Sequence, residues 1–262
     1  MPVEESLITW PVVIIAAHPD DETVGAGGFL PRLHPPWIVT VTDGSPRNPS
    51  DAHAAGYQLR EDYARARRQE LLNALDAAGV SELLAFGLNR TDQEVSLGMA
   101  ELARRIASIF RDLRPGAVLT HPYEGGHPDH DATAFAVHAA CALSSIPPKI
   151  YEFTSYHAAS RNGDMEVGRF LIDQEPGEAV ALSNDDRERK ARMIECFASQ
   201  LHMLRRFPVD IERFRDAPAY DFTQPPHTGK LFYENFDWGM TGPRWRQLAA
   251  EALRELGIPN RL

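Results

Sequence analysis

The chain has 262 residues, of which 43% are hydrophobic and 24% are charged, a composition that is typical of globular proteins and excludes a disordered one. Asp and Glu number 37 against 27 Lys and Arg, and the net charge of -10 disfavours nucleic acid as a partner, because its phosphates are also negative. Only two cysteines are present, which excludes a disulfide scaffold and a thiolate metal cluster.

The first apolar stretch, residues 7–17, is interpreted as a buried strand. It is shorter than the ~18 apolar residues that a membrane span needs. The residues before it include Glu4 and Glu5 and no base, whereas a signal peptide begins with positive charge. We therefore predict a cytoplasmic protein without a transmembrane segment.

The first 155 residues alternate strand-like and helix-like segments. Short apolar or β-branched runs predict strands, and the longer amphipathic stretches between them predict helices. This alternation implies a mostly parallel sheet, and the continuously apolar strands imply helices on both of its faces. The predicted strands are 12–17, 37–42, 83–86, 117–120 and 149–154, and the predicted helices are 58–78, about 102–113 and about 130–143.

The pattern changes after residue 155, where the predicted elements become fewer and less regular. We find no repeat and no convincing linker, so one domain over residues 1–262 is expected, with a core of about 10–205. The elements predicted here are a polar loop at 156–166, a strand at 167–172, a helix at about 185–206 and a final helix at about 244–256.

The C-terminal extension, about residues 206–262, is rich in aromatic residues. Residues 207–245 contain 9 of the 23 aromatic side chains and little periodicity. Two interpretations stay open: the favoured one is a core packed against the final helix, and the other is a wall on which a sugar stacks. The residues concerned are Tyr220, Phe222, Phe232, Tyr233, Phe236, Trp238 and Trp245.

Three polar clusters directly follow predicted strands, at residues 18–22, 43–44 and 121–130. Ligands of an open parallel sheet bind beyond the carboxyl ends of its strands. We therefore expect the three clusters to meet at one edge of the sheet, although they are far apart in the sequence.

Two of these clusters combine histidine and carboxylate in a way that suits a metal ion. His18 and Asp21 are three residues apart, as are His127 and His130, so one turn aims each pair at one point. Each pair alone is equally compatible with a helix cap or a surface ion pair, but the two together favour a zinc or iron site. Two histidines and a carboxylate leave a position for water, and Asp20 is placed to accept its proton.

The sequences AHPDDE at 17–22, TDG at 42–44 and HPDH at 127–130 resemble the motifs of the PIG-L/LmbE-like family of zinc-dependent N-acetylglucosaminyl deacetylases. The order and separation of the motifs match, and the resemblance covers roughly residues 10–205. It implies a Rossmann-like α/β fold and Zn²⁺ as cofactor. The activity that it implies is a linear amidohydrolase, which removes an N-acyl group from an amino sugar or a small glycoconjugate.

The resemblance also implies roles for single residues. His18, Asp21 and His130 resemble the zinc ligands of the family, and Asp20 resembles its general base. His127 resembles the imidazole that assists the tetrahedral intermediate or protonates the leaving amine.

The neighbours of these residues are less clearly matched to the family. Asp129 is expected to orient a histidine. Some members place a tyrosine two residues before the His127 position as an oxyanion donor, but this chain has Gly125 there and its Tyr123 is displaced.

Two further residues are predicted to support the site or to bind the substrate. Arg68 is in line with apolar positions of the predicted helix 58–78, so we expect it to face inward and to pair with Asp20 or Asp43. The alternative is a surface arginine whose stem covers apolar area. Asp43 is expected to fix a ligand histidine or the substrate, with capping of the strand end as the alternative.

Two other functions stay open. Two histidines and a carboxylate also form the facial triad of non-haem iron oxygenases, although that chemistry needs no base beside a ligand, as Asp20 is. A non-catalytic sugar- or metal-binding protein of the same fold is the second alternative, although it would have no need to keep Asp20 and His127. The sequence leaves open the sugar conjugate, the acyl group, the pathway and the oligomeric state, including a homo-oligomer.

Overall fold

The structure, a computed structural model, describes residues 3–33, 36–159, 164–171 and 174–262. Its centre is a seven-stranded sheet made of β1 (Val12–Ala16), β2 (Pro36–Pro46), β3 (Ala85–Asp92), β4 (Ala117–Thr120), β5 (Lys149–Phe153), β8 (Glu178–Ala181) and β9 (Ile211–Asp216). The strand order is β3-β2-β1-β4-β5-β9-β8. The first five strands in this order are parallel, and β9 and β8 extend the sheet in antiparallel fashion.

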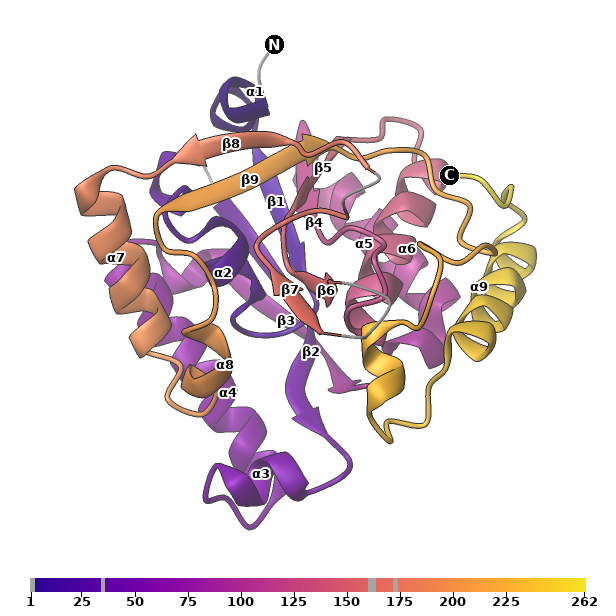
Figure 1. Cartoon of the computed structure of the whole chain (residues 1–262). Coiled ribbons are helices and arrows are strands. Elements are labelled where there is room, and N and C mark those ends of the chain that lie inside the picture. The colour runs from indigo at the N-terminus through magenta and orange to yellow at the C-terminus, as the bar shows by residue number, and fades with distance from the viewer. Residues whose placement is uncertain (1–2, 34–35, 160–163, 172–173) are drawn as a thin grey trace.

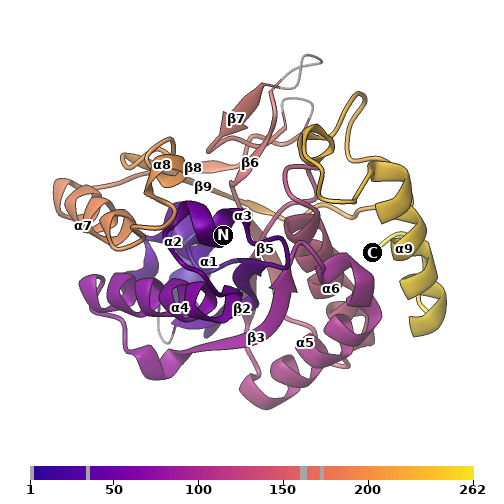
Figure 2. The same ribbon diagram turned by 90° about the horizontal axis from the view of Figure 1, so that it is seen from below.

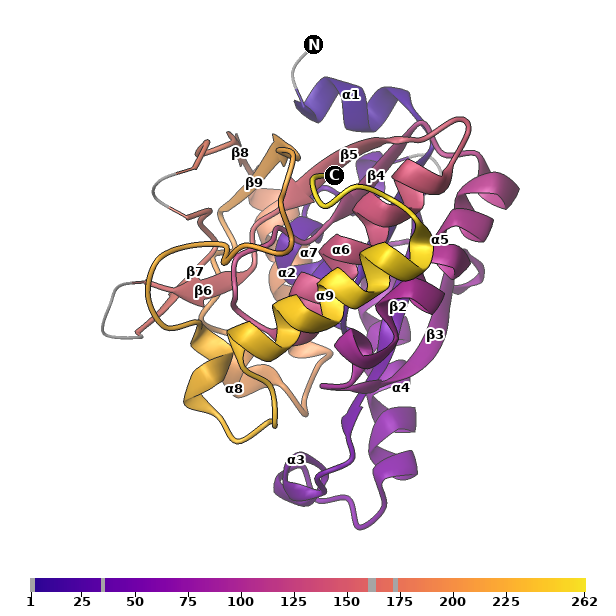
Figure 3. The same cartoon turned by 90° about the vertical axis from the view of Figure 1, so that its right-hand side faces the viewer.

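Helices cover both faces of the sheet (Figures 1 and 2). One face is covered by α2 (Asp21–Ala26), α4 (Arg60–Ala77), α7 (Asn184–Glu195) and α8 (Leu201–Leu204). The other face is covered by α5 (Met99–Leu113), α6 (Pro128–Leu143) and α9 (Gly242–Leu256), and Figure 3 shows α9 crossing in front of α5 and α6. Two short helices, α1 (Val3–Thr9) and α3 (Ser50–Ala54), lie outside these layers, and 3-10 turns occupy Leu30–Arg32, Glu82–Leu84, Val95–Gly98 and Phe232–Asn235.

The predicted fold class is confirmed: the sheet is mostly parallel and has helices on both faces. The predicted strand 117–120 coincides with β4, and the predicted helices 58–78 and 130–143 match α4 and α6 to within two residues at each end. The third strand is longer than predicted, because β3 continues beyond Phe86 to Asp92. Among the described residues, no helix is both long enough and apolar enough to cross a membrane.

The second half of the chain departs from prediction in three places. The predicted loop 156–166 contains most of a hairpin of β6 (Tyr156–Ala158) and β7 (Met165–Val167), so a strand beginning at residue 167 is wrong. Of that predicted strand, residue 172 lies outside the described residues. No strand was predicted at β8 or β9, and β9 lies in the aromatic-rich extension, which therefore supplies part of the central sheet.

The predicted helix 185–206 is also wrong, because it is two helices, α7 and α8, with a break between them. The break is stabilised by a tertiary contact: the Glu70 carboxylate of α4 accepts hydrogen bonds from the backbone N–H of Ser199 at 2.8 Å and from its hydroxyl at 2.6 Å. Hydrogen bonds to Glu70, which lies on another helix, thus take the place of the helical hydrogen bonds that the apolar periodicity of residues 185–206 suggested.

A buried ion pair fixes the helix that carries the first motif. Lys190 of α7 is fully buried, and its Nζ donates to the Val24 carbonyl of α2 at 2.8 Å and to Glu212 of β9 at 2.9 Å. Glu212 also accepts the Gly28 N–H at 2.8 Å. Because a buried charge is costly without its partners, these bonds fix the position of α2 against the edge of the sheet.

Candidate active site

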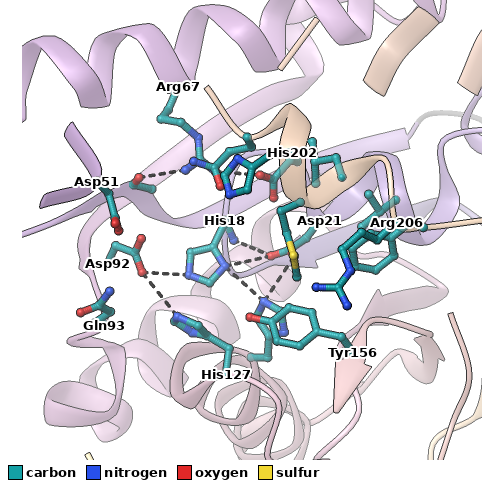
Figure 4. A pocket seen from close by; sticks show the side chains of 18 of the residues that line it. His18, Asp21, Asp51, Arg67, Asp92, Gln93, His127, Tyr156, His202 and Arg206 are labelled. Atoms are coloured by element: carbon teal, nitrogen blue, oxygen red, sulfur yellow. Dashed lines mark hydrogen bonds and ion pairs between the residues drawn. The ribbon is translucent and has the colours of Figure 1, made fainter. Parts of the chain in front are cut away.

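A cavity of about 390 Å³ opens at the carboxyl ends of β1 and β4 (Figure 4). These adjacent strands are the switch point of the sheet, since their connections lead to opposite halves of it, and doubly wound folds bind ligands there. The first and third polar clusters, 18–22 and 121–130, both contribute lining residues, as expected, together with Gly44 of the second. Residues beyond 155 complete the walls.

The donor atoms of three side chains converge on the floor of this cavity. The Nδ1 atom of His18 lies 3.2 Å from Asp21 Oδ2 and 3.2 Å from His130 Nε2, and His130 Nε2 lies 3.3 Å from Asp21 Oδ1. All three side chains are buried. A tetrahedral ion at ~2.0–2.2 Å from its ligands holds them about 3.3 Å apart, so the spacing fits one divalent metal ion.

Other donor combinations in the cavity also lie close enough for a metal ion. His127 groups with His18 and His130, and it also groups with His18, Asp92 and Asp129. His121 groups with Asp21 and His130, but its Nε2 already accepts the Ala17 N–H at 3.0 Å, and its ring stacks on His130 with centroids 4.1 Å apart. The structure therefore gives His121 a packing role.

Two carboxylates hold the far side of the His18 ring. Its Nε2 lies 3.1 Å from Asp92 Oδ1 and 3.6 Å from Asp129 Oδ2, which leaves Nδ1 facing Asp21 (Figure 4). The expectation that Asp129 orients a histidine fits this contact, and Asp129 also accepts the N–H groups of Gln93 and Val95. Such carboxylates set the tautomer and the orientation of a ligand histidine.

Asp92 was missed in the sequence analysis. It ends β3, whose predicted range stopped six residues earlier. If the predicted strand had extended to residue 92, Asp92 would have stood at its carboxyl end. It would then have been a candidate site residue, because ligands bind beyond the carboxyl ends of parallel strands. Burial alone would raise the pKa of Asp92, but its contact with His18 holds the pKa well below the usual range.

Asp20 lies beside the donor cluster in a strained conformation. Its φ of 137° is far outside the usual regions for a residue with a side chain, and such strain is common at active sites. Arg67 of α4 holds it: one guanidinium nitrogen donates to Asp20 Oδ2 at 2.8 Å and to the Pro19 carbonyl at 2.8 Å, and the other donates to Gly44 at 3.0 Å. Burial raises the pKa of the Asp20 carboxyl, although Arg67 acts against this.

His127 is fixed in one tautomer by the start of α6. Its Nδ1 accepts the N–H of Asp129 at 3.1 Å, so in the neutral ring the hydrogen is on Nε2. Nε2 points into the cavity and lies 3.8 Å from Asp92 Oδ1. Burial, and then the nearby His18, lower the pKa of His127 well below its usual range, which favours the neutral ring. The ring thus offers a hydrogen-bond donor to a ligand.

Residues 13–141 match the PIG-L family, described as GlcNAc-PI de-N-acetylase. This chain carries a PIG-L family domain. The matched range holds both histidine motifs and the whole cluster of donor atoms, and it confirms the family resemblance predicted from those motifs.

The relatives of this PIG-L domain are enzymes named as deacetylases. Over 208 residues the chain is 28% identical to diacetylchitobiose deacetylase of Thermococcus kodakarensis, covering 76% of this chain and 71% of that protein. It is 29% identical over 161 residues to a probable N-acetyl-alpha-D-glucosaminyl L-malate deacetylase 2 of Bacillus cereus, covering 60% and 71%.

A solved deacetylase of the teicoplanin biosynthesis pathway superposes with a TM-score of 0.57. It is 21% identical and covers 74% of this chain and 86% of its own. At that identity the superposition speaks for the fold alone.

Arg68 does not make the contacts expected of it, and Asp43 makes those of the alternative, capping of the strand end. Arg68 donates to the Ala85 carbonyl at 2.7 Å, away from the cavity, and Arg67 takes the inward position. The buried face of α4 includes Tyr63, Arg67 and Leu71, which are four residues apart. Arg68 is one residue further along the helix than Arg67, so its side chain points in a different direction. Asp43 contacts no histidine among the described residues; it pairs with Arg60 and caps its own turn, accepting the Ser45 N–H at 3.1 Å.

The tyrosine that some family members have two residues before the His127 position is replaced by Gly125 in this chain. Gly125 has φ +71°, and the hydroxyl of Tyr123 donates to the Gln224 carbonyl at 2.9 Å, outside the cavity. Tyr156 of β6 lines the cavity instead, with its ring centroid 5.3 Å from that of His130. Its hydroxyl hydrogen-bonds to none of the described residues, and Figure 4 shows the ring beside the histidines.

Tyr156 reaches the cavity because its strand passes very close to the loop before His127. A Cβ on Gly126 would lie 1.9 Å from the Tyr156 carbonyl oxygen, so only glycine permits this approach. From the sequence, Tyr156 is expected in a polar loop and has no assigned role. Such a long-range contact leaves no periodic pattern in the residues around it.

Proposed function

We propose that the protein is a zinc-dependent hydrolase that removes an N-acyl group, with N-acetyl as the first candidate, from an amino sugar or its conjugate. The observation that carries this proposal is the carboxylate of Asp20 beside the three converging donors of His18, Asp21 and His130. The names of the relatives, which are deacetylases of N-acetylated sugars, support the same chemistry. A cytoplasmic location and a small glycoconjugate as substrate remain predictions.

His18, Asp21 and His130 would hold the Zn²⁺, which supplies Lewis acidity and lowers the pKa of water. Asp20 acts as the base: Arg67 occupies its Oδ2, while Oδ1 has no partner among the described residues and accepts the proton of the attacking water. The same carboxyl then returns this proton to the amine when the carbon–nitrogen bond breaks. A single group thus carries out both proton transfers.

His127 and Tyr156 bind the oxygen of the scissile amide. The Nε2–H of His127 and the unpartnered hydroxyl of Tyr156 are both donors on the cavity wall. As negative charge develops on that oxygen, preorganised donors stabilise it more than water does. In this proposal Tyr156 is the oxyanion donor that some family members supply as a tyrosine at the position of Gly125, which has no side chain.

The alternatives are disfavoured by the surroundings of Asp20. A facial-triad oxygenase needs no base beside its ligands, and a binding protein needs no strained aspartate held by a buried arginine. Metal analysis of the natively purified protein separates zinc from iron.

A substrate panel tests the proposal. The zinc-loaded protein is incubated with N-acetylglucosamine conjugates, acylated peptides and phosphoesters, and amine or phosphate release is measured. We expect amine from the sugars alone. Release from peptides alone would refute the sugar assignment and leave amide hydrolysis intact, whereas no amine from any amide would refute the hydrolase.

The adjacent arginines provide a matched pair of variants. Arg67→Met is expected to lower kcat by ~10²-fold, because Asp20 loses the contact that positions it and small displacements of a catalytic group have effects of this size. Arg68→Met is expected to stay within about twofold, since it reaches only the Ala85 carbonyl. Steady-state kinetics and thermal unfolding of both variants check this. Equal activity losses in the two would contradict the role of Arg67.

A further inference from the structure

The aromatic residues of the extension divide into two groups. Four of them, Tyr220, Phe222, Tyr233 and Trp245, are buried and pack with the core beside α9, as the favoured interpretation predicted. The other three, Phe232, Phe236 and Trp238, line the cavity, and Trp238 also packs against this core. Phe236 is 42% exposed, a large apolar surface to leave in contact with water. We call these three residues the aromatic wall.

The rings of the aromatic wall are joined by direct contacts with one another and with the residues of the site. The Trp238 ring contacts His127, with centroids 4.8 Å apart, and stacks on Phe236 at 4.5 Å with an interplanar angle of 12°. Phe236 in turn lies 5.4 Å from Phe232, whose ring is 5.6 Å from Tyr156. Because Tyr156 lies beside His130, both ends of this chain of rings lie beside the histidines. Phe236, which is 42% exposed, is the ring furthest along the chain from them, so it offers a face to a ring bound outside the floor of the cavity.

Polar side chains without partners accompany these rings. Gln93 and Arg206 both line the cavity, and Figure 4 shows them on either side of the histidines. Neither side chain has a hydrogen bond or ion pair with any described residue. If an apolar chain bound on the aromatic wall, Gln93 and Arg206 would lose their hydrogen bonds to water and gain no new ones, which costs free energy. A hexose satisfies both features, because it has an apolar C–H face and hydroxyls around its edge.

We propose that the aromatic wall is a subsite for a second sugar ring, joined to the N-acylated one. The substrate class is then a disaccharide or larger oligosaccharide and not a free monosaccharide. This inference rests on the proposed function, since the acylated sugar must occupy the floor beside His18 and Asp20. The wall lies beyond residues 13–141, so this specificity is built by a part of the chain outside the family match.

The test compares two substrates, N,N'-diacetylchitobiose and N-acetylglucosamine. In Phe236→Ala the ratio of kcat/KM for the disaccharide to that for the monosaccharide is expected to fall about tenfold, the factor that one lost ring contact can produce. Trp238→Phe keeps a ring and should lose less. Ile146→Ala is the control, because Ile146 is 87% exposed and lies before β5, at the opposite edge of the sheet. It should leave the ratio unchanged.

A binding measurement separates the wall from the chemistry. Deacetylated chitobiose, which has no acyl group to lose, is titrated while tryptophan fluorescence is followed. We expect a change in wild type that is absent in Trp238→Phe, and a weaker affinity in Phe236→Ala. If no amide is hydrolysed, the proposed function fails and this titration still tests the wall. If Phe236→Ala left the ratio of kcat/KM values unchanged, because neither value fell or because both fell by the same factor, the second-ring subsite would be overturned.

Discussion

Asp20→Asn is expected to keep the bound metal and to lower kcat for the acylated sugar by ~10²–10⁴-fold. The asparagine has nearly the same shape, and its amide oxygen still accepts a hydrogen bond from Arg67. The amide cannot take a proton from water, however, so the base is lost while the geometry stays. Steady-state kinetics and metal analysis of the same preparation measure the two effects together.

Asp43→Asn is the matched control for this variant. Asp43 also follows a parallel strand, but it pairs with Arg60 and does not line the cavity. We expect its activity within about twofold of wild type. If Asp20→Asn were as active as this control, Asp20 would be only structural and the proton transfers assigned to it would be wrong.

His130→Ala is expected to weaken metal binding by more than ~100-fold, and His18→Ala and Asp21→Ala should do the same. Loss of a residue that merely supports a ligand already lowers affinity by ~10–100-fold, and loss of a ligand leaves only two donors. Metal content after dialysis, together with competition against a chromophoric chelator, gives the affinities. Full occupancy in any one of these variants would remove that residue from the ligand set.

His127→Ala decides between the competing sets of donor atoms. We expect it to retain the metal and to lose turnover, because Nδ1 of His127 is committed to the N–H of Asp129 and Nε2–H serves the substrate. Loss of the metal in His127→Ala would instead favour the set of His18, His127 and His130, whose donor atoms are also close together.

In these proposals, chemistry and specificity come from different parts of this chain. The residues that match the family, 13–141, contain every proposed metal ligand, Asp20, Arg67 and His127. Tyr156, Arg206 and the aromatic wall all come from later in the chain. This division would explain why the reaction is recognisable from two short motifs while the sugar conjugate is not, because most of the residues proposed to contact the conjugate lie outside the family match.

Some features of the site could be predicted because they depend on local sequence. The strand ending at Ala16 and the strand Ala117–Thr120 are short apolar runs, and their order with helices between them implies parallel neighbours. Once those strands are parallel, residues that directly follow them lie at one edge. The meeting of His18, Asp21 and His130 follows from that rule and from spacings of three.

Other features were decided only by the tertiary structure. Arg67 and Arg68 are neighbours in one helix, and the rotation of α4 against the sheet determines which of them reaches Asp20. Tyr156 enters the cavity because a hairpin packs on Gly126, and three aromatic rings turn toward the cavity while four others enter the core. Periodicity reports only whether a segment has an apolar face. Which partner covers that face depends on contacts between residues far apart in the chain, and no local pattern encodes them.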